Sequence, residues 1–397
     1  MIVRIPFSEI LKRVKESRDI NKDDESDLKM NIDSLQKTLL PAPKTSDTSI
    51  SCGTRDRRHS RVDLEITETN YDKVDNKVLW RRFMESNEDF RLTAQTIWNF
   101  AIDHAIPNSS RLRLWRRATF QVPPGISAEL QAVYKSDSSN YAKQSDVPSA
   151  TVNSILVDLP RTPWLTSKEE SEDLAKVLMA FAMRNPKVGY CQGMNLIVAI
   201  PLIVGMNTQE ALSFLEKTVC IRMSGLLQGC PGQTDLFVFK SHVMKTSSVV
   251  ERIFPDIHAV LQNAAIDLML ISFDAFLTLF SSRMPLHAVL RTWDFCILSH
   301  EYSPRELDQP SPSIVSCLVA FIKCFLCPLA QDFSDGPLIA AYHRRLASLS
   351  IDEIQLALEQ AREYLPLVVK SLTFCNIKLN DDSDEDSSVF SEEPLSP

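Results

Sequence analysis

The sequence predicts an all-α protein in which one multi-helix domain lies between two polar tails. Nine glycines against 22 prolines favour helices with proline-marked ends over tight hairpins. Helix-start signals and apolar residues at helical spacing recur between residues 79 and 375. The sequence has no strand–helix alternation, fixed-period repeat or glycine-rich phosphate loop, so it does not predict a nucleotide-binding fold.

Residues 1–78 are predicted to be a largely disordered N-terminal segment. They hold fifteen basic and fifteen acidic residues with Ser/Thr/Asp clusters, a composition typical of linkers. One short amphipathic helix is expected within them, because Phe7, Ile10, Leu11 and Val14 share helical spacing among basic residues. It would bind a membrane surface or a partner, or else dock on the domain itself.

Three helices of the domain can be placed from their ends. The segment Ser167–Glu170 forms a capping box, and its helix must end near Asn185-Pro186, because proline disfavours helical geometry in the preceding residue. The segment Asn207–Glu210 opens a second helix, and 351–370 is expected to form a third, amphipathic one.

Residues 376–397 are predicted to be an acidic, disordered tail. Seven acidic residues and no basic one lie between 381 and 397, beside serines that could be phosphorylated. Without these seven charges the formal net charge of −8 falls to −1. No general attraction to nucleic acid or acidic lipid is therefore expected.

Cysteine usage and hydropathy predict a soluble, cytoplasmic protein. Nine cysteines show no paired framework, and the N terminus has no sustained apolar leader. The apolar segments 193–206 and 315–330 are short and interrupted by Asn195, Pro201 or Lys323, so no transmembrane segment is expected. Any residence on endomembranes would be peripheral and through a partner.

Other chemical signals in the sequence are weak. Cys324 and Cys327 have the spacing of a zinc or redox pair, but they lie in an apolar run with no second pair, so buried thiols are expected. The seven histidines do not cluster as ligands, and no metal site is expected. No serine lies in a recognisable nucleophile elbow.

Two motifs point to a function: Ile155-x-x-Asp158-x-x-Arg161 and Tyr190-x-Gln192-Gly193. Hydrolysis of a nucleotide γ-phosphate needs positive charge against the phosphate oxygens and a group that orients the attacking water. Arginine is a permanently charged fork of donors, and the glutamine amide both donates to and accepts from one water. Taken singly, such an arginine is more often in a surface ion pair, and such a glutamine is more often a helix cap.

With their surroundings these motifs resemble the TBC domain of Rab GTPase-activating proteins. Further motifs follow the family's order over about residues 80–372. They are Ile106-Pro107-x-x-x-Arg111-x-x-x-Trp115, Phe276–Phe280 with Met284-Pro285, and Val289-Leu-Arg291-Thr-Trp293-Asp294. The resemblance implies an all-α TBC fold and a small GTPase as partner.

The resemblance implies two catalytic residues. Arg161 would be the arginine finger, and Gln192 would replace the GTPase's own glutamine in orienting water. The chain would need no cofactor of its own, because GTP and Mg²⁺ are carried by the partner GTPase.

Five further residues are expected to support this pair. Asp158 would hydrogen-bond the loop of Arg161 or pair with it, and Gly193 would let the partner approach closely. Tyr190 and Asn195 would hold the second loop. Arg111 is expected to be structural or to lie near the binding groove.

The sequence departs from the family pattern at several points. Ala105 stands where a glycine is common, Ala275 stands where a tryptophan is common, and a glycine expected after Asp294 is absent. Residues 302–313 resemble a proline-rich insertion. These changes concern packing and loops, and the run from Arg291 to Asp294 is itself expected to be a packing motif.

The sequence therefore predicts an activator that accelerates GTP hydrolysis on a Rab-family GTPase in its GTP state, regulating vesicle trafficking. The alternative from another class is a non-catalytic Rab-binding adaptor or scaffold in membrane trafficking. A third interpretation is a GTPase target outside the Rab group.

Overall fold

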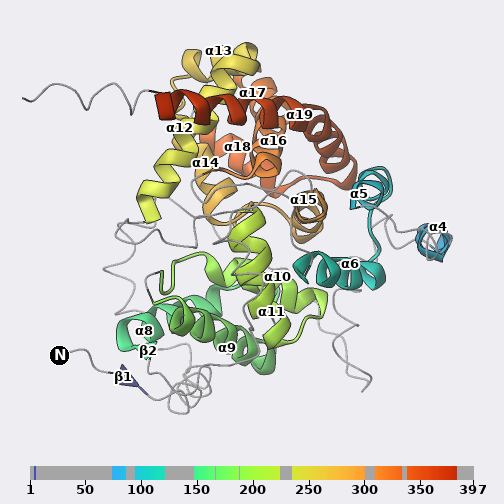
Figure 1. Cartoon of the computed structure of the whole chain (residues 1–397), viewed down its shortest axis with the longest axis vertical. Coiled ribbons are helices and arrows are strands. Elements are labelled where there is room, and N and C mark those ends of the chain that lie inside the picture. Colours follow the sequence, from blue (N-terminus) through green and yellow to red (C-terminus); the bar gives the residue numbers. More distant parts are fainter. Residues whose placement is uncertain are drawn as a thin grey trace, which may run out of the picture.

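The described part of the chain is almost entirely helical, as predicted (Figure 1). The computed structural model describes residues 4–5, 74–85, 94–120, 147–165, 167–186, 188–223, 235–299, 309–332 and 338–381. The predicted N-terminal amphipathic helix and the tail beyond residue 381 lie outside the described residues. Two short strands, β1 (Arg4–Ile5) and β2 (Val147–Pro148), pair antiparallel.

The helices follow one another through the domain. In chain order they are α4 (Val74–Glu85), α5 (Ala94–Asp103), α6 (Asn108–Phe120), α8 (Ser149–Asp158), η2 (Leu159–Arg161), α9 (Lys168–Arg184), α10 (Met194–Val204), α11 (Thr208–Phe214), η3 (Leu215–Met223), α12 (Asp235–Ile253), α13 (Pro255–Asn263), α14 (Leu268–Leu277), α15 (Leu286–Leu298), α16 (Pro312–Phe321), η6 (Ile322–Leu326), α17 (Cys327–Asp332), α18 (Leu338–Ala347) and α19 (Ile351–Asp381).

The predicted starts of α9 and α11 and the predicted end of α9 are confirmed. In α9 the Glu170 N–H donates to Ser167 Oγ at 3.0 Å while Glu170 Oε2 accepts from the Ser167 N–H at 3.0 Å, and the helix ends at Arg184. The segment Asn207–Glu210 caps α11 in the same way. The helix expected over 351–370 continues to Asp381, and α4 already begins at Val74. Helical structure therefore extends beyond both ends of the range 79–375.

Helix α15 lies at the centre of the helical packing. In Figure 1, α8 to α11 lie on one side of the molecule and most of α12 to α19 on the other. Helix α15 contacts α5, α6, η3, α16 and α19. Its Trp293 ring lies 5.9 Å from the Trp115 ring and 6.1 Å from the Phe214 ring, both in stacked orientation. This aromatic stack joins α6, α11 and α15 in one hydrophobic core.

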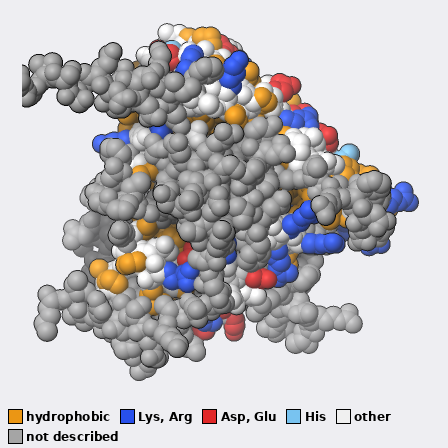
Figure 2. All heavy atoms as spheres, in the orientation of Figure 1, with side chains coloured by type: hydrophobic (Ala, Val, Ile, Leu, Met, Phe, Trp, Pro, Cys, Tyr) orange, Lys and Arg blue, Asp and Glu red, His pale blue; other side chains and the backbone are white. Residues whose placement is uncertain are grey.

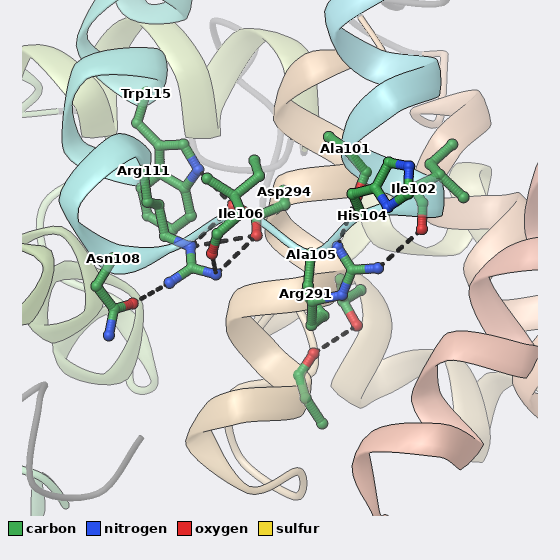
Figure 3. Close-up of polar contacts among 12 residues, drawn as sticks. Ala101, Ile102, His104, Ala105, Ile106, Asn108, Arg111, Trp115, Arg291 and Asp294 are labelled. Atoms are coloured by element: carbon green, nitrogen blue, oxygen red, sulfur yellow. Dashed lines mark hydrogen bonds and ion pairs between the residues drawn. The ribbon is translucent and has the colours of Figure 1, made fainter. Parts of the chain in front are cut away.

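A buried ion pair fixes α6 to α15 (Figure 3). Arg111 Nη2 lies 2.9 Å from Asp294 Oδ2, and both side chains are at most 3% exposed. The Trp115 indole N–H donates to Asp294 Oδ1 at 2.8 Å, and Arg111 Nη2 donates to the Ile106 carbonyl at 2.8 Å. Each charged group thus has several partners, as burial of a charge requires.

Arg291, one turn before Asp294 on α15, connects α15 to α5. Its Nη1 donates to the Ala101 carbonyl at 2.7 Å and its Nη2 to the Ile102 carbonyl at 3.1 Å (Figure 3). The Gln355 side chain of α19 also donates to the Ile102 carbonyl, at 2.8 Å. Arg291, Trp293 and Asp294 are all buried, which agrees with their prediction as a packing motif.

Helices α16, η6 and α17 form one continuous apolar helix. The helix Pro312–Gln331 is long enough to cross a membrane and contains an 18-residue stretch with a mean hydropathy of 2.1, but 72% of that stretch is buried inside the protein. The interruption expected at Lys323 is wrong, because this exposed side chain pairs with Asp256 outside the core. Burial on this scale is typical of the core helix of a globular domain.

Surface charge is uneven over the described helices. Helix α6 carries four arginines and no acidic residue. Arg111 is buried, whereas Arg116 reaches the surface and pairs with Glu210 at 2.8 Å. Figure 2 shows Lys and Arg side chains on the right-hand side of this face, where Figure 1 places α4 and α6.

His287 is expected to make the fold less stable in mild acid. Its Nε2 lies 2.9 Å from the Leu349 carbonyl, and burial lowers its pKa, a shift partly offset by that hydrogen bond. The unfolded chain, with a histidine pKa of about 6.5, therefore binds the proton first. The stability that neutral His287 contributes is complete above about pH 6.5, and it is lost as the pH falls through the lower pKa of this histidine in the folded state. Urea unfolding between pH 7.5 and 5 should show falling stability and a shallower fall in His287→Gln; equal slopes would contradict this prediction.

Candidate functional site

Arg161 lies at the end of a short, closed turn. The segment η2 continues α8 as a 3₁₀ turn, with Leu159 buried below it and Pro160 exposed. The Thr162 N–H donates to the Leu159 carbonyl at 3.2 Å, and Thr162 Oγ1 donates to the Asp158 carbonyl at 2.9 Å. Proline restricts the backbone, and these bonds fix the rest, so the position of Arg161 is held by its neighbours.

Gln192 lies on a second turn, between α9 and α10. The turn starts where the N–H groups of Val188 and Gly189 donate to the Asn185 carbonyl, at 3.0 and 2.8 Å. It ends at Gly193, whose φ of 99° is in the left-handed region. The Met194 N–H donates to the Cys191 carbonyl at 3.1 Å, so that Gln192 lies within a hydrogen-bonded turn.

Four residues link the two turns; we call Asp158, Thr162, Tyr190 and Asn195 the Asp158 network. The Tyr190 hydroxyl donates to Asp158 Oδ2 at 2.7 Å. Asn195 Nδ2 donates to Thr162 Oγ1 at 2.9 Å and lies 3.3 Å from the Asp158 carbonyl. Burial, and next the hydrogen bond to Asp158, raise the pKa of Tyr190, so its hydroxyl keeps the proton that it donates. The network therefore fixes the turn of Arg161 relative to the turn of Gln192.

The side chains of Arg161 and Gln192 extend from these turns into solvent. Both residues are exposed, and neither side chain makes a hydrogen bond or ion pair within the described residues. Asp158, one of the sequence-predicted partners of Arg161, instead accepts from Tyr190. The guanidinium of Arg161 and the amide of Gln192 therefore extend from two rigid turns, and within the described residues their N–H groups have no hydrogen-bond acceptor.

Gly193 permits close packing between the Gln192 turn and α14. A Cβ at Gly193 would lie 3.0 Å from Thr278 Cγ2, tighter than ordinary contact. Thr278 is itself held by the bond from its Oγ1 to the Asp274 carbonyl at 3.0 Å. A side chain at position 193 would require Thr278 to shift, so glycine is favoured here by packing as well as by the backbone conformation.

Gly193→Ala is expected to lower the free energy of unfolding by about 1–3 kcal/mol, because a non-glycine residue at this φ is strained and its methyl meets Thr278. Thr278→Ser keeps the hydroxyl and removes the obstructing methyl. The double variant Gly193→Ala/Thr278→Ser should therefore recover the stability lost to the methyl clash, and the loss caused by backbone strain at position 193 should remain. A double-mutant cycle in urea measures both, and strictly additive effects would show that the methyl contact is unimportant.

The structure brings six of the seven predicted site residues together, with Gly193 closing the turn of Gln192. Asp158, Tyr190 and Asn195 belong to the linking network, and Arg161 and Gln192 extend from it. Arg111 is separate, because its side chain bonds to Asp294, Asn108 and the Ile106 carbonyl, in the buried contact between α6 and α15. Of its two predicted roles, the contacts therefore favour the structural one.

Sequence reasoning missed two contributors to this site. Thr162 directly follows Arg161, and this position in the motif could have marked it as part of the site. In the structure it is buried, at 5% exposed. Thr278 directly follows α14, far along the chain, and no local pattern connects it with Gly193. Among the described residues no group of three or more His, Cys, Asp or Glu could hold a metal ion. Burial raises the pKa of the thiols of Cys324 and Cys327, which are free.

Comparison with known families agrees with this geometry. The model of the Rab-GTPase-TBC domain matches residues 108–327, more than half of the chain. The chain therefore belongs to the Rab-GTPase-TBC domain family, which confirms the resemblance inferred from its motifs.

Curated relatives are similar at low identity. A TBC domain-containing protein of Schizosaccharomyces pombe is 28% identical over 49% of this chain and 25% of its own length. TBC1 domain family member 2B of Xenopus tropicalis is 25% identical over 74% of this chain and 33% of its own length. Growth hormone-regulated TBC protein 6 of Caenorhabditis elegans is 25% identical over 56% of this chain and 61% of its own length. The chain thus spans only part of each relative.

Two crystal structures share the fold. The Chlamydomonas flagellar RabGAP TBC domain aligns with a TM-score of 0.51 at 19% identity, covering 77% of this chain and 93% of that one. The Ypt/Rab-GAP domain of Gyp1p aligns with a TM-score of 0.51 at 17% identity, covering 72% and 97%. At these identities the likeness shows the common all-α fold.

Proposed function

We propose that this chain activates GTP hydrolysis on a Rab-family small GTPase by supplying Arg161 and Gln192 to the nucleotide site of that partner. One observation carries the proposal: both side chains are exposed and unpaired within the described residues, and they lie on two turns that the Asp158 network joins. Family membership supports a Rab-type partner.

Arg161 supplies charge in this proposal. In phosphoryl transfer, negative charge spreads over the oxygens of the transferred group and the leaving oxygen, and little covalent chemistry is left for the protein. A guanidinium placed beside these oxygens in a water-excluded interface stabilises the transition state more than the ground state. Because Arg161 makes no hydrogen bond within the described residues, it has none there to break when it enters the partner's site.

Gln192 orients the attacking water. Its amide oxygen accepts from the water and its NH₂ donates, so one side chain can fix both the place and the direction of attack. GTP and Mg²⁺ stay with the partner, and the chain needs no cofactor. A GTPase whose own glutamine is missing should then still respond to this chain.

The Asp158 network has a positioning role. A finger displaced by about 1 Å costs much of its effect, since orientation is the main contribution here. The tyrosine–aspartate bond of 2.7 Å and the asparagine–threonine bond of 2.9 Å cross-link two turns that are distant in sequence. Tyr190 and Asn195 thus act through Arg161 and Gln192.

The expected setting is the cytoplasmic face of a trafficking membrane, where the partner would recruit the chain.

A GTPase lacking its own catalytic glutamine tests the role of Gln192. Single-turnover hydrolysis is measured for a responsive Rab and for the same Rab with that glutamine changed to alanine. Wild-type chain should accelerate both, and Gln192→Ala should accelerate neither appreciably. If the Rab variant no longer responds to wild-type chain, the water is oriented by the GTPase and the proposed role of Gln192 is wrong. Tight GTP-dependent binding without acceleration of any Rab would instead identify an adaptor.

A further inference from the structure

Helix α14 exposes two large apolar side chains on one face. Leu270 is 55% exposed and Phe273 is 50% exposed, and they are three residues apart, the spacing that places side chains on the same side of a helix. The opposite face of α14 is buried through residues such as Leu268, Ile271 and Phe276. Apolar residues scattered singly over a surface are common, whereas Leu270 and Phe273 lie side by side on one helix face. We call Leu270 and Phe273 the α14 ridge.

The ridge is held in a defined orientation. The ring of Phe273 meets the buried ring of Phe239 on α12 edge-to-face, with 5.8 Å between ring centroids and 76° between planes. Half of Phe273 is therefore anchored while the other half remains in solvent. Ordered aromatic residues of this kind bind partners at low entropic cost and dominate binding energy at interfaces.

The ridge lies on the helix whose C-terminal end packs against the Gln192 turn. Helix α14 ends at Leu277, whose carbonyl oxygen is 3.9 Å from the position of a Gly193 Cβ, and Thr278 Cγ2 is 3.0 Å from it. At 1.5 Å per residue, Phe273 lies about 6 Å and Leu270 about 10 Å along the helix from that contact. On the other turn, Val157 is 51% exposed, four residues before Arg161. Exposed apolar surface therefore lies next to both turns.

Two finger side chains cannot by themselves hold a partner. A specific protein interface buries about 800 Å² on each side and takes most of its affinity from a few apolar or aromatic anchors. A GTPase that received Arg161 and Gln192 would necessarily cover the surface around them. Two helices with exposed large apolar residues pack against the Gln192 turn: α14 carries the pair Leu270 and Phe273, whereas α8, through Asp158 and Tyr190, carries Val157 alone.

We propose that the α14 ridge binds an apolar surface of the GTP-loaded small GTPase, and that it sets the affinity for this partner. This inference rests on the proposed function. The two groups of residues would have different roles. Arg161 and Gln192 would determine the rate of the chemical step, and the α14 ridge would determine the affinity. Partner choice would then depend on the shape of the GTPase surface that meets the ridge.

The test compares ridge variants with matched variants elsewhere. Phe273→Ala and Leu270→Ala are measured against Leu356→Ala and Leu367→Ala on α19, whose side chains are 63% and 46% exposed. The probe is the Rab that responds best, loaded with a non-hydrolysable GTP analogue for Kd and with GTP for single-turnover kinetics. Ridge variants should raise Kd and KM by about 10- to 30-fold with kcat unchanged, and the α19 variants should change neither. Leu270→Ala keeps the test decisive if loss of the Phe239 contact disturbs folding in Phe273→Ala.

Several outcomes would overturn the ridge proposal. Unchanged Kd in both ridge variants, equal effects from the α19 variants, or no binding of any GTP-loaded Rab by wild-type chain would each do so. A dimer of this chain that Phe273→Ala dissociates, with Rab affinity unchanged, would assign the ridge to self-association. Binding without acceleration would refute the catalytic proposal alone, because Kd would still report on the ridge.

Discussion

Replacing Arg161 by alanine is expected to lower the accelerated rate of GTP hydrolysis by about 10³–10⁵-fold, the usual worth of an arginine finger. The physical reason is that the variant removes the guanidinium proposed to stabilise the negative charge on the phosphate oxygens. Single-turnover hydrolysis at saturating chain measures the loss directly. Arg161→Lys should recover only part of the rate, because an ammonium keeps the charge and loses the planar fork of donors.

The same variant should leave the fold and binding largely intact. Arg161 is exposed and makes no hydrogen bond or ion pair within the described residues, so its removal costs the domain little. Thermal unfolding should match wild type, and the Kd for a GTP-loaded Rab should change far less than the rate. Acceleration that persists in Arg161→Ala would show that another residue supplies the charge.

Asp294→Ala is expected to be the most damaging single change to stability, at about 3–5 kcal/mol. Its carboxylate accepts from Arg111 at 2.9 Å and from the Trp115 indole at 2.8 Å, and all three side chains are buried. Removing it leaves a guanidinium charge uncompensated in the core and an indole N–H without a partner. Urea unfolding followed by far-ultraviolet circular dichroism gives the loss.

An exposed ion pair provides the control for that experiment. Asp103 pairs with Arg362 at 2.6 Å, but these side chains are 52% and 35% exposed. Asp103→Ala should therefore cost no more than about 1 kcal/mol. Replacing Arg111 and Asp294 together by apolar residues of similar size should recover much of the loss, because no charge would remain buried. A loss below 1 kcal/mol in Asp294→Ala would contradict the role given to this pair.

Local signals predicted the helix ends well. A capping box is read from four neighbouring residues, and both Ser167–Glu170 and Asn207–Glu210 form the predicted bonds. Pro186 limits α9 through its own ring, without any tertiary contact. Arg161 and Gln192 could be found for a similar reason, since each lies in a short motif beside a turn.

Long-range packing is what the sequence could not predict. The bond from Tyr190 to Asp158 joins two separate motifs, and the contact of Thr278 with Gly193 joins two distant helices. The apolar helix through Lys323 continues because that side chain can reach solvent and Asp256, which depends on where α13 packs. Such outcomes depend on tertiary geometry, which residue spacing does not encode.

The α14 ridge shows the same limit. Hydrophobic spacing in Leu268–Leu277 predicts a helix, but it does not say which apolar residues stay at the surface. Only the packed structure separates Leu270 and Phe273 from the buried side chains beside them.

The central claim is that two side chains of this chain act together in one GTPase nucleotide site. The most direct test is single-turnover GTP hydrolysis across a purified Rab panel with wild type, Arg161→Ala and Gln192→Ala in parallel. The account predicts that wild type accelerates a subset of Rabs and that each variant loses that acceleration while still binding the same GTP-loaded Rabs. Failure of wild type to accelerate any Rab under conditions where a known activator works, or equal acceleration by wild type and both variants, would contradict it.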